Sequence, residues 1–166
     1  MKVILREADV KDVDVINQMF ERLAAQHQNL TGIPVLQNIK TMFGTPEDSE
    51  PTQYIKDIIN NNKYKLWVLT DEDIEILGLV HFAIVRSELM PDATDIYIYY
   101  LISNYENHGV ATRLLDIVKN VARKHRCLGV SLDVLTDNSK ASTLYIKQGF
   151  QILRSDAIRK RMYCKL

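Results

Sequence analysis

A short segment in the second half of the chain has the residue types of an anion-binding turn. Gly109, Val110 and Ala111 open a helical pattern soon after a strand-like run that ends at Ile102. The first backbone N–H groups of a helix lack partners within it and carry the positive end of its dipole, so they attract phosphate groups. Glycine lets the backbone approach such a ligand, and a small side chain leaves room for it. Taken alone, the segment is better explained by ordinary turn chemistry, with a pyrophosphate site as the alternative.

A second segment, residues 138–150, combines a helix cap with a tyrosine that could donate a proton. Asn138 can cap a helix that ends before Gly149, and Tyr145 shares one helical face with Ala141. A phenol can give either a hydrogen bond or a proton to a leaving group. From the residues alone, Tyr145 is better explained as a core residue and Asn138 as a plain cap.

Other kinds of site are not indicated. A dinucleotide-binding turn would follow the first strand with a fuller G-x-G-x-x-G, and a P-loop would continue with Gly-Lys-Ser/Thr; the sequence has neither. The histidines have no metal-ligand spacing, so no metal is expected. They are His27, His81, His108 and His125. Cys127 and Cys164 lack CxxC spacing and are expected to be buried structural thiols.

Composition limits the partners that the chain can be expected to bind. Its 166 residues include 21 Lys and Arg against 21 Asp and Glu, which gives no net charge. Neither nucleic acid nor a membrane is indicated as a partner. The N-terminus reads as neither a signal nor a transit peptide, and no stretch of about 18 apolar residues follows. We expect a single cytoplasmic domain over residues 1–166.

The periodicity of apolar residues predicts the elements that position these segments. The expected order is strand, helix, helix, three strands, helix, strand, helix and two strands, which indicates a mixed α/β (α+β) fold. The expected strands are 2–6, 66–70, 74–85, 95–102, 130–135, 150–153 and 160–165. The expected helices are a first one capped by Asp9 with apolar positions from Val13 to Ala24, then 52–60, a third that begins at 110 and ends in the charged run 123–126, and 138–148. Residues 26–51 are expected to be a long loop around one helical turn.

The two segments together resemble the GNAT superfamily of N-acetyltransferases. Residues 106–111 match that family's Q/R-x-x-G-x-G/A segment, except that Glu106 replaces Gln or Arg. About thirty residues later the family pattern N-x-x-A-x-x-x-Y-x-x-x-G-F appears without a gap. Its five specified residues are Asn138, Ala141, Tyr145, Gly149 and Phe150. The resemblance covers residues 95–150 and implies one mostly antiparallel sheet flanked by helices.

The resemblance also implies roles for the residues of an acetyl-CoA site. The pyrophosphate would lie on the backbone amides of Asn107, His108, Gly109, Val110, Ala111 and Thr112. The strand edge at Leu101 and Ile102 would pair with the pantetheine arm, and the Leu101 N–H would polarise the thioester carbonyl. Asn138 would bond to the cofactor, and Tyr145 would be the general acid.

The resemblance leaves the base and the acceptor open. Asp95 falls, by counting back from Gly109, where the histone-acetyltransferase branch carries its catalytic glutamate. His81, Tyr97 and Glu88 are the alternatives, with His81 better explained as a core histidine. The acidic residues of the expected loop could attract a cationic amine. They are Glu47, Asp48 and Glu50.

Two charged features bear on how the cofactor would bind. Glu106 would repel a pyrophosphate unless its carboxylate points to solvent or pairs with a cation such as Arg113. A basic cluster near the C-terminus is expected to be a solvated edge, with binding of the adenosine 3′-phosphate as the alternative. It consists of Arg154, Arg159, Lys160 and Arg161.

The expected function is acetyl transfer from acetyl-CoA to the amine of a small molecule or peptide, by direct attack in a ternary complex. A non-catalytic acyl-CoA-binding module on the same fold is the alternative from another class. A third interpretation is an interaction protein that forms a homodimer through the edge of the hairpin expected from strands 66–70 and 74–85. Sequence patterns do not choose among polyamine, aminoglycoside, amino-acid and peptide acceptors.

Overall fold

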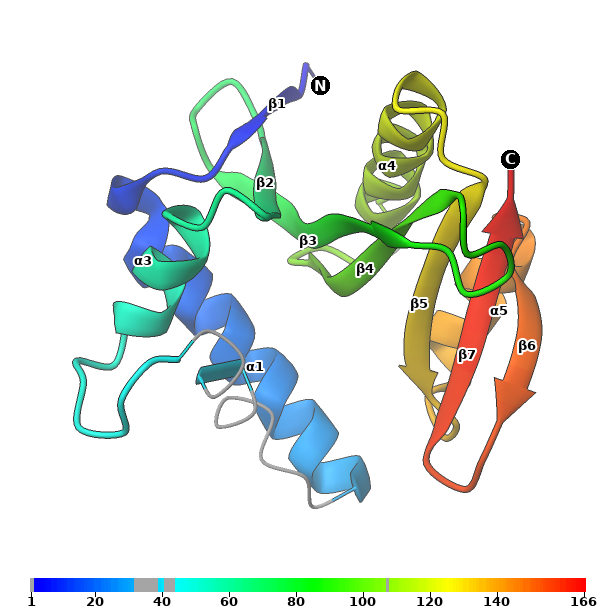
Figure 1. The fold of residues 1–166 in the computed structure, drawn as a ribbon. Coiled ribbons are helices and arrows are strands. Elements are labelled where there is room, and N and C mark those ends of the chain that lie inside the picture. Colours follow the sequence, from blue (N-terminus) through cyan, green and yellow to red (C-terminus); the bar gives the residue numbers. More distant parts are fainter. Residues whose placement is uncertain (1, 32–38, 41–43, 107) are drawn as a thin grey trace.

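Seven strands form one twisted sheet in the order β1-β2-β3-β4-β5-β7-β6 (Figure 1). The computed structural model describes residues 2–31, 39–40, 44–106 and 108–166. All neighbouring strands are antiparallel except β4 and β5, which are parallel. The strands are β1 Ile4–Glu7, β2 Tyr64–Thr70, β3 Ile76–Arg86, β4 Thr94–Ser103, β5 Gly129–Leu135, β6 Gln151–Ser155 and β7 Arg159–Lys165. The mostly antiparallel sheet and the element order confirm the predicted fold class.

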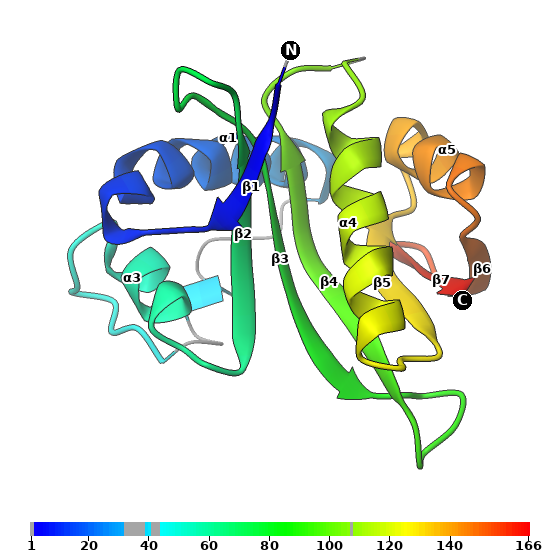
Figure 2. The same cartoon turned by 90° about the horizontal axis from the view of Figure 1, so that it is seen from above.

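Helices cover both faces of the sheet and enclose two hydrophobic clusters. They are α1 Val13–Thr31, α3 Gln53–Ile59, α4 Val110–Lys124 and α5 Ser139–Lys147. On one face α4 lies across the centre of the sheet and packs on β3, β4 and β5 (Figure 2). On the other face α1 and α3 cover β2 and β3. No helix among the described residues is long and apolar enough to cross a membrane.

The first helix is longer than the sequence predicts. Asp9 and Asp12 form a capping box around a short 3-10 turn, as the cap prediction required, and α1 then runs on to Thr31. The expectation that residues 26–31 belong to a loop is therefore wrong. Polar residues such as Gln26 and His27 interrupt the apolar stripe but not the helical backbone, because only one helix face has to be apolar. The extension places His27 beside the sheet.

Candidate functional site

The parallel strands β4 and β5 pair at one end and diverge at the other. Their ladder covers only Ile96 to Ile98 of β4, whereas β5 pairs with β7 along its whole length. A bulge follows directly, because Tyr100 lies opposite His81 and Ile98 lies opposite Phe82, which leaves Tyr99 without a partner in β3. A bulge bends its strand and increases the local twist. The two strands thus diverge beyond Ile98 of β4.

The edge of β4 that is released faces the gap between the two strands. Leu101 and Ile102 lie beyond the end of the β4–β5 ladder and pair only with β3. Leu101 packs toward the α4 cluster, whereas Tyr100 and Ile102 pack toward the α1 cluster. Backbone groups on such an edge are available to an extended ligand.

Helix α4 begins with an open backbone. Its N-cap, Gly109, has a φ of 73°, a left-handed conformation that residues with a Cβ rarely adopt. No side chain of a described residue caps the helix, and a Cβ added to Gly109 would meet no described atom within 4 Å. Val110 is buried and anchors the first turn, while Ala111 and Thr112 are half-buried. The open backbone fits a bound pyrophosphate.

The residues just before α4 are exposed. His108 is exposed, and its ring contacts the ring of Tyr105 with 6.0 Å between centroids. Asn107, which the resemblance placed among the pyrophosphate ligands, lies outside the described residues.

Helix α5 carries the second sequence segment. Asn138 caps it by accepting a hydrogen bond from the Ala141 N–H at 3.1 Å, and Gly149 follows its end with a φ of 92°. The Tyr145 ring contacts Phe150 with 5.6 Å between centroids. Burial raises the pKa of Tyr145 to about 12, so its hydroxyl keeps its proton at neutral pH.

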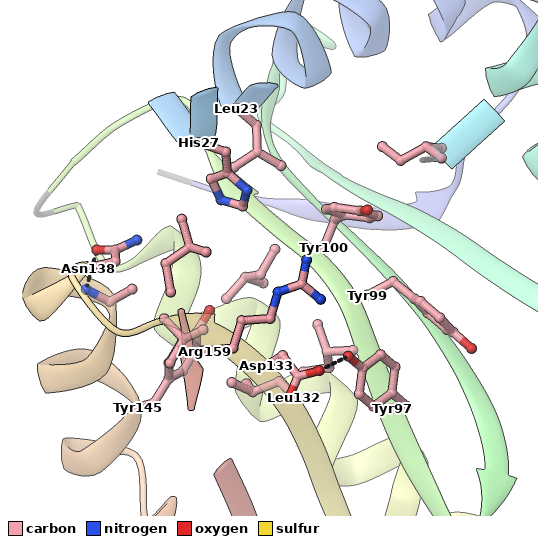
Figure 3. A pocket seen from close by; sticks show the side chains of 16 residues that line it. Leu23, His27, Tyr97, Tyr99, Tyr100, Leu132, Asp133, Asn138, Tyr145 and Arg159 are labelled. Atoms are coloured by element: carbon pink, nitrogen blue, oxygen red, sulfur yellow. Dashed lines mark hydrogen bonds between the residues drawn. The ribbon is translucent and has the colours of Figure 1, made fainter. Parts of the chain in front are cut away.

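A cavity of about 350 Å³ lies between α1, β4, β5, α5 and the start of β7 (Figure 3). Its lining comes from α1 (Leu23, His27), Ile39, β4 (Tyr97 to Leu101), β5 (Leu132 to Leu135), α5 (Asn138, Ala141, Tyr145) and β7 (Arg159). Leu101, Asn138 and Tyr145 are the predicted site residues that the structure brings together here. Among the described residues no group of three or more His, Cys, Asp and Glu side chains could hold a metal ion.

One wall of the cavity is built on the carboxylate of Asp133. The Tyr97 hydroxyl donates to it at 2.9 Å, and Arg161 donates two hydrogen bonds, at 2.6 and 3.0 Å. Burial works to raise the pKa of Asp133, but the bonds from Arg161 and Tyr97 outweigh it, so the pKa is lowered. Asp133 is therefore an anchored, ionised group rather than a proton acceptor.

Sequence comparison decides the family of this chain. A model of the acetyltransferase (GNAT) family matches residues 33–150, well over half of the sequence. The chain belongs to the GNAT acetyltransferase family.

Individual proteins similar to this GNAT chain come from sequence and structure comparison. YdhI of Bacillus subtilis (strain 168) is 33% identical over 81 residues, which cover 49% of this chain and 46% of YdhI. A mutant of the BH1408 protein of Bacillus halodurans has a TM-score of 0.74 at 19% identity, covering 92% of this chain and 96% of that one. The PaiA N-acetyltransferase of Thermoplasma acidophilum, in complex with coenzyme A, has a TM-score of 0.73 at 14% identity over 100% of both chains. The two solved structures share the fold.

The unusual Glu106 of this GNAT chain forms an ion pair with a lysine of α5. Its carboxylate lies 2.5 Å from the ammonium of Lys140, and both side chains are exposed. The partner is thus Lys140 of α5 and not Arg113, which the sequence had suggested. Because the charge of Glu106 is matched by Lys140, its repulsion of a phosphate is reduced.

Asp95 lies apart from the other predicted site residues of the acetyltransferase. It is 1% exposed, near the start of β4, and is not among the residues that line the cavity. Its Oδ1 accepts hydrogen bonds from the Gly129 N–H at 3.0 Å and from the Tyr163 hydroxyl at 2.9 Å. This geometry ties β4 to β5 and β7, so the structure supports a structural role for Asp95 rather than that of a base.

We expect Asp95→Ala to lower stability more than activity. Loss of the carboxylate leaves two buried donors without an acceptor, which costs about 2–3 kcal/mol of unfolding free energy in urea titrations. In the folded variant kcat should stay within about threefold of wild type, whereas loss of a general base costs on the order of 10²-fold. Asp116→Ala, on the exposed side of α4, is the matched control. A large loss of kcat at full stability would restore Asp95 as the base.

The other candidates from the sequence are also poorly placed to accept a proton from the amine. His81 is fully buried against Tyr99, with 5.0 Å between ring centroids, and burial lowers its pKa to about 3. Glu88 pairs with Arg154 and Arg161 and is not part of the cavity lining. Tyr97 lines the cavity but donates to Asp133.

Sequence reasoning missed two residues that line the cavity, His27 and Arg159. His27 fell in the expected loop, and Arg159 was grouped with three other basic residues as a solvated edge. Had the first helix been predicted to continue past residue 26, His27 would have been expected on a helix that packs against the sheet. Strand alternation in β7 could have separated Arg159 and Arg161 from Lys160.

Proposed function

We propose that this chain transfers an acetyl group from acetyl-CoA to an amine, which attacks the thioester directly in a ternary complex. The observation that carries the proposal is the cavity between the diverging strands. It brings Leu101, on the released edge of β4, together with Asn138 and Tyr145 of α5. Family membership supports acetyl transfer in general, and the cavity supports these residues as its site.

The donor substrate would be held by backbone groups on the α4 side of the gap. The open amides from Gly109 to Thr112 suit the pyrophosphate, and the edge of β4 at Leu101 and Ile102 suits the amides of the pantetheine arm. The Leu101 N–H would stabilise the oxyanion that forms on the thioester carbonyl. Asn138 would add a hydrogen bond to the donor from its amide group.

Transfer requires two proton movements. The neutral amine nitrogen attacks the carbonyl carbon, a C–N bond forms, and collapse of the tetrahedral intermediate breaks the C–S bond. Tyr145 would supply the proton that the departing sulfur takes up, and solvent would then reprotonate the phenolate. The amine reacts as the neutral base, because an alkylammonium has no lone pair with which to attack. Its nitrogen becomes positively charged as the C–N bond forms and then gives its extra proton to a base.

We assign the base to His27. It is half-buried on α1 and lines the cavity together with Tyr100 and Arg159, which are the titratable and charged groups facing it from β4 and β7. Burial, and secondly the positive charge of Arg159, lower the pKa of His27 below its ordinary value. The imidazole is therefore neutral at physiological pH and able to accept a proton.

His27→Gln should reduce kcat/KM on the order of 10²-fold, the contribution of a positioned general base. In the wild type kcat/KM should fall as the pH is lowered through the pKa of His27, which lies below about 6.5. This acid limb should be absent from the pH profile of His27→Gln. His125→Gln, at the far end of α4, is the control. An unchanged acid limb in His27→Gln would show that the base is another group.

Release of free thiol from acetyl-CoA across a panel of amines tests the proposed function. Amine-dependent release with equal amounts of acetylated amine supports it. A chain whose melting temperature rises with acetyl-CoA but which turns over no amine would instead be the acyl-CoA-binding module considered above. No response to acetyl-CoA in either assay would contradict both.

A further inference from the structure

Three arginines of the β6–β7 hairpin differ in how their charges are matched. Arg154 donates to Glu88 at 2.8 Å, and Arg161 donates to Glu88 at 2.6 Å and to Asp133. Arg159, at the start of β7, lines the cavity, and its guanidinium lies inside it, directed toward Tyr100 (Figure 3). No carboxylate of a described residue forms an ion pair with Arg159. The residues outside the described ranges contain no Asp or Glu.

The carboxylates nearest to Arg159 are engaged elsewhere. Asp133 is held by Arg161 and Tyr97. Asp156 accepts the backbone N–H groups of Ile158 at 2.7 Å and of Arg159 itself at 2.8 Å, so its carboxylate closes the hairpin turn. The guanidinium of Arg159 is left to a ligand or to water.

Arg159 brings a positive charge into the cavity that no carboxylate of a described residue holds in an ion pair. Glu88 and Asp133 form ion pairs with Arg154 and Arg161, and His27 is neutral at physiological pH. Asp133 and Asp156 interact with Arg159 only at longer range, so its guanidinium acts as a local positive charge in the cavity. A polycationic amine would be repelled by this charge, while an acceptor that carries a negative group would be attracted.

Arg159 also lies on the acceptor side of the sheet. Along β7, Met162 and Cys164 pack into the cluster with α4, so Arg159 and Arg161 alternate to the opposite face. The first turn of α4, proposed above for the pyrophosphate, is on the other face. Arg159 is therefore poorly placed to bind the cofactor's phosphates, and it faces His27, the proposed base.

We propose that Arg159 binds a carboxylate of the acceptor, so that the substrate is a small amine bearing a carboxylate, such as a free amino acid. The proposal rests on the acetyltransferase function proposed above. A guanidinium can hold a carboxylate through two parallel hydrogen bonds, which orient the acceptor and also neutralise its negative charge. A cavity of about 350 Å³ suits a small acceptor better than a folded protein segment.

The test compares each amino acid with its amide and with its decarboxylated amine as acceptors in the thiol-release assay. The wild type should favour the carboxylate member by about 10- to 100-fold in kcat/KM, the effect of a charge-assisted bidentate pair. Arg159→Gln should abolish this preference and leave the KM for acetyl-CoA unchanged. Arg159→Lys should keep part of the preference. Arg154→Gln, an exposed arginine of the same hairpin, is the control and should retain all of it.

Several results would overturn the proposal. The amide or the decarboxylated amine could react as well as the amino acid, or Arg159→Gln could raise the KM for acetyl-CoA and affect all acceptors equally. Binding of acetyl-CoA with no turnover of any carboxylate-bearing amine would also reject the proposed acceptor. Failure of acetyl-CoA to bind at all, seen as an unchanged melting temperature, would instead contradict the proposed function.

Discussion

Tyr145→Phe should lower kcat on the order of 10²- to 10³-fold, because the departing sulfur loses the proton donor that general acid catalysis provides. The ring keeps its packing against Phe150, and the Tyr145 hydroxyl donates to none of the described residues, so the fold loses no contact. Stability should change by less than about 0.5 kcal/mol. The dissociation constant for acetyl-CoA should also stay close to that of the wild type. Single-turnover kinetics with a calorimetric titration would separate the chemical step from binding.

Tyr105→Phe is a suitable control for Tyr145→Phe. Tyr105 is exposed and lies outside the cavity. Its hydroxyl donates a hydrogen bond to Glu75, the residue just before β3. The same atom is therefore removed from a tyrosine without a proposed role in transfer. If both variants keep wild-type kcat, Tyr145 is a core residue and the proton comes from elsewhere.

Ala111→Glu should weaken acetyl-CoA binding on the order of 10²-fold at low salt, because it places a carboxylate beside the proposed pyrophosphate site. An acidic residue in the first turn of a helix is favourable to the helix itself, so α4 should remain intact. Ala111→Gln has nearly the same shape without the charge. The difference in dissociation constant between the two variants, measured by calorimetry, isolates the electrostatic part.

Salt provides a second check on the Ala111 variants. The difference between Glu and Gln at this position should shrink as ionic strength rises, since mobile ions screen exposed charges. Equal affinities for the two variants at low salt would show that the pyrophosphate does not lie at the start of α4.

The sequence was most informative about residues whose structural role depends on their neighbours in the chain. The caps at Asp9 and Asn138 and the turns at Gly109 and Gly149 depend on near neighbours, and the structure contains each of them. The element order follows from periodicity for the same reason. The length of α1 was missed because its last turns lack an apolar stripe.

The composition of the cavity depends on contacts that local patterns do not contain. Asp95 was assigned to the site by counting back from Gly109, but such a count does not show which end of β4 stays paired with β5. Asp95 lies at the paired end, away from the cavity. The bulge at Tyr99 also shifts which face each later residue occupies. His27 and Arg159 lie 132 positions apart in the sequence, so no local pattern predicts that they line the same cavity.

The most direct test of the account is mass spectrometry of the reaction with isotope-labelled acetyl-CoA and an amino-acid acceptor. We expect the label on the nitrogen of the acceptor, free CoA in equal amount, and no labelled protein, because the amine attacks the thioester itself. Label retained on the protein, or CoA released without an acetylated amine, would contradict direct transfer in a ternary complex.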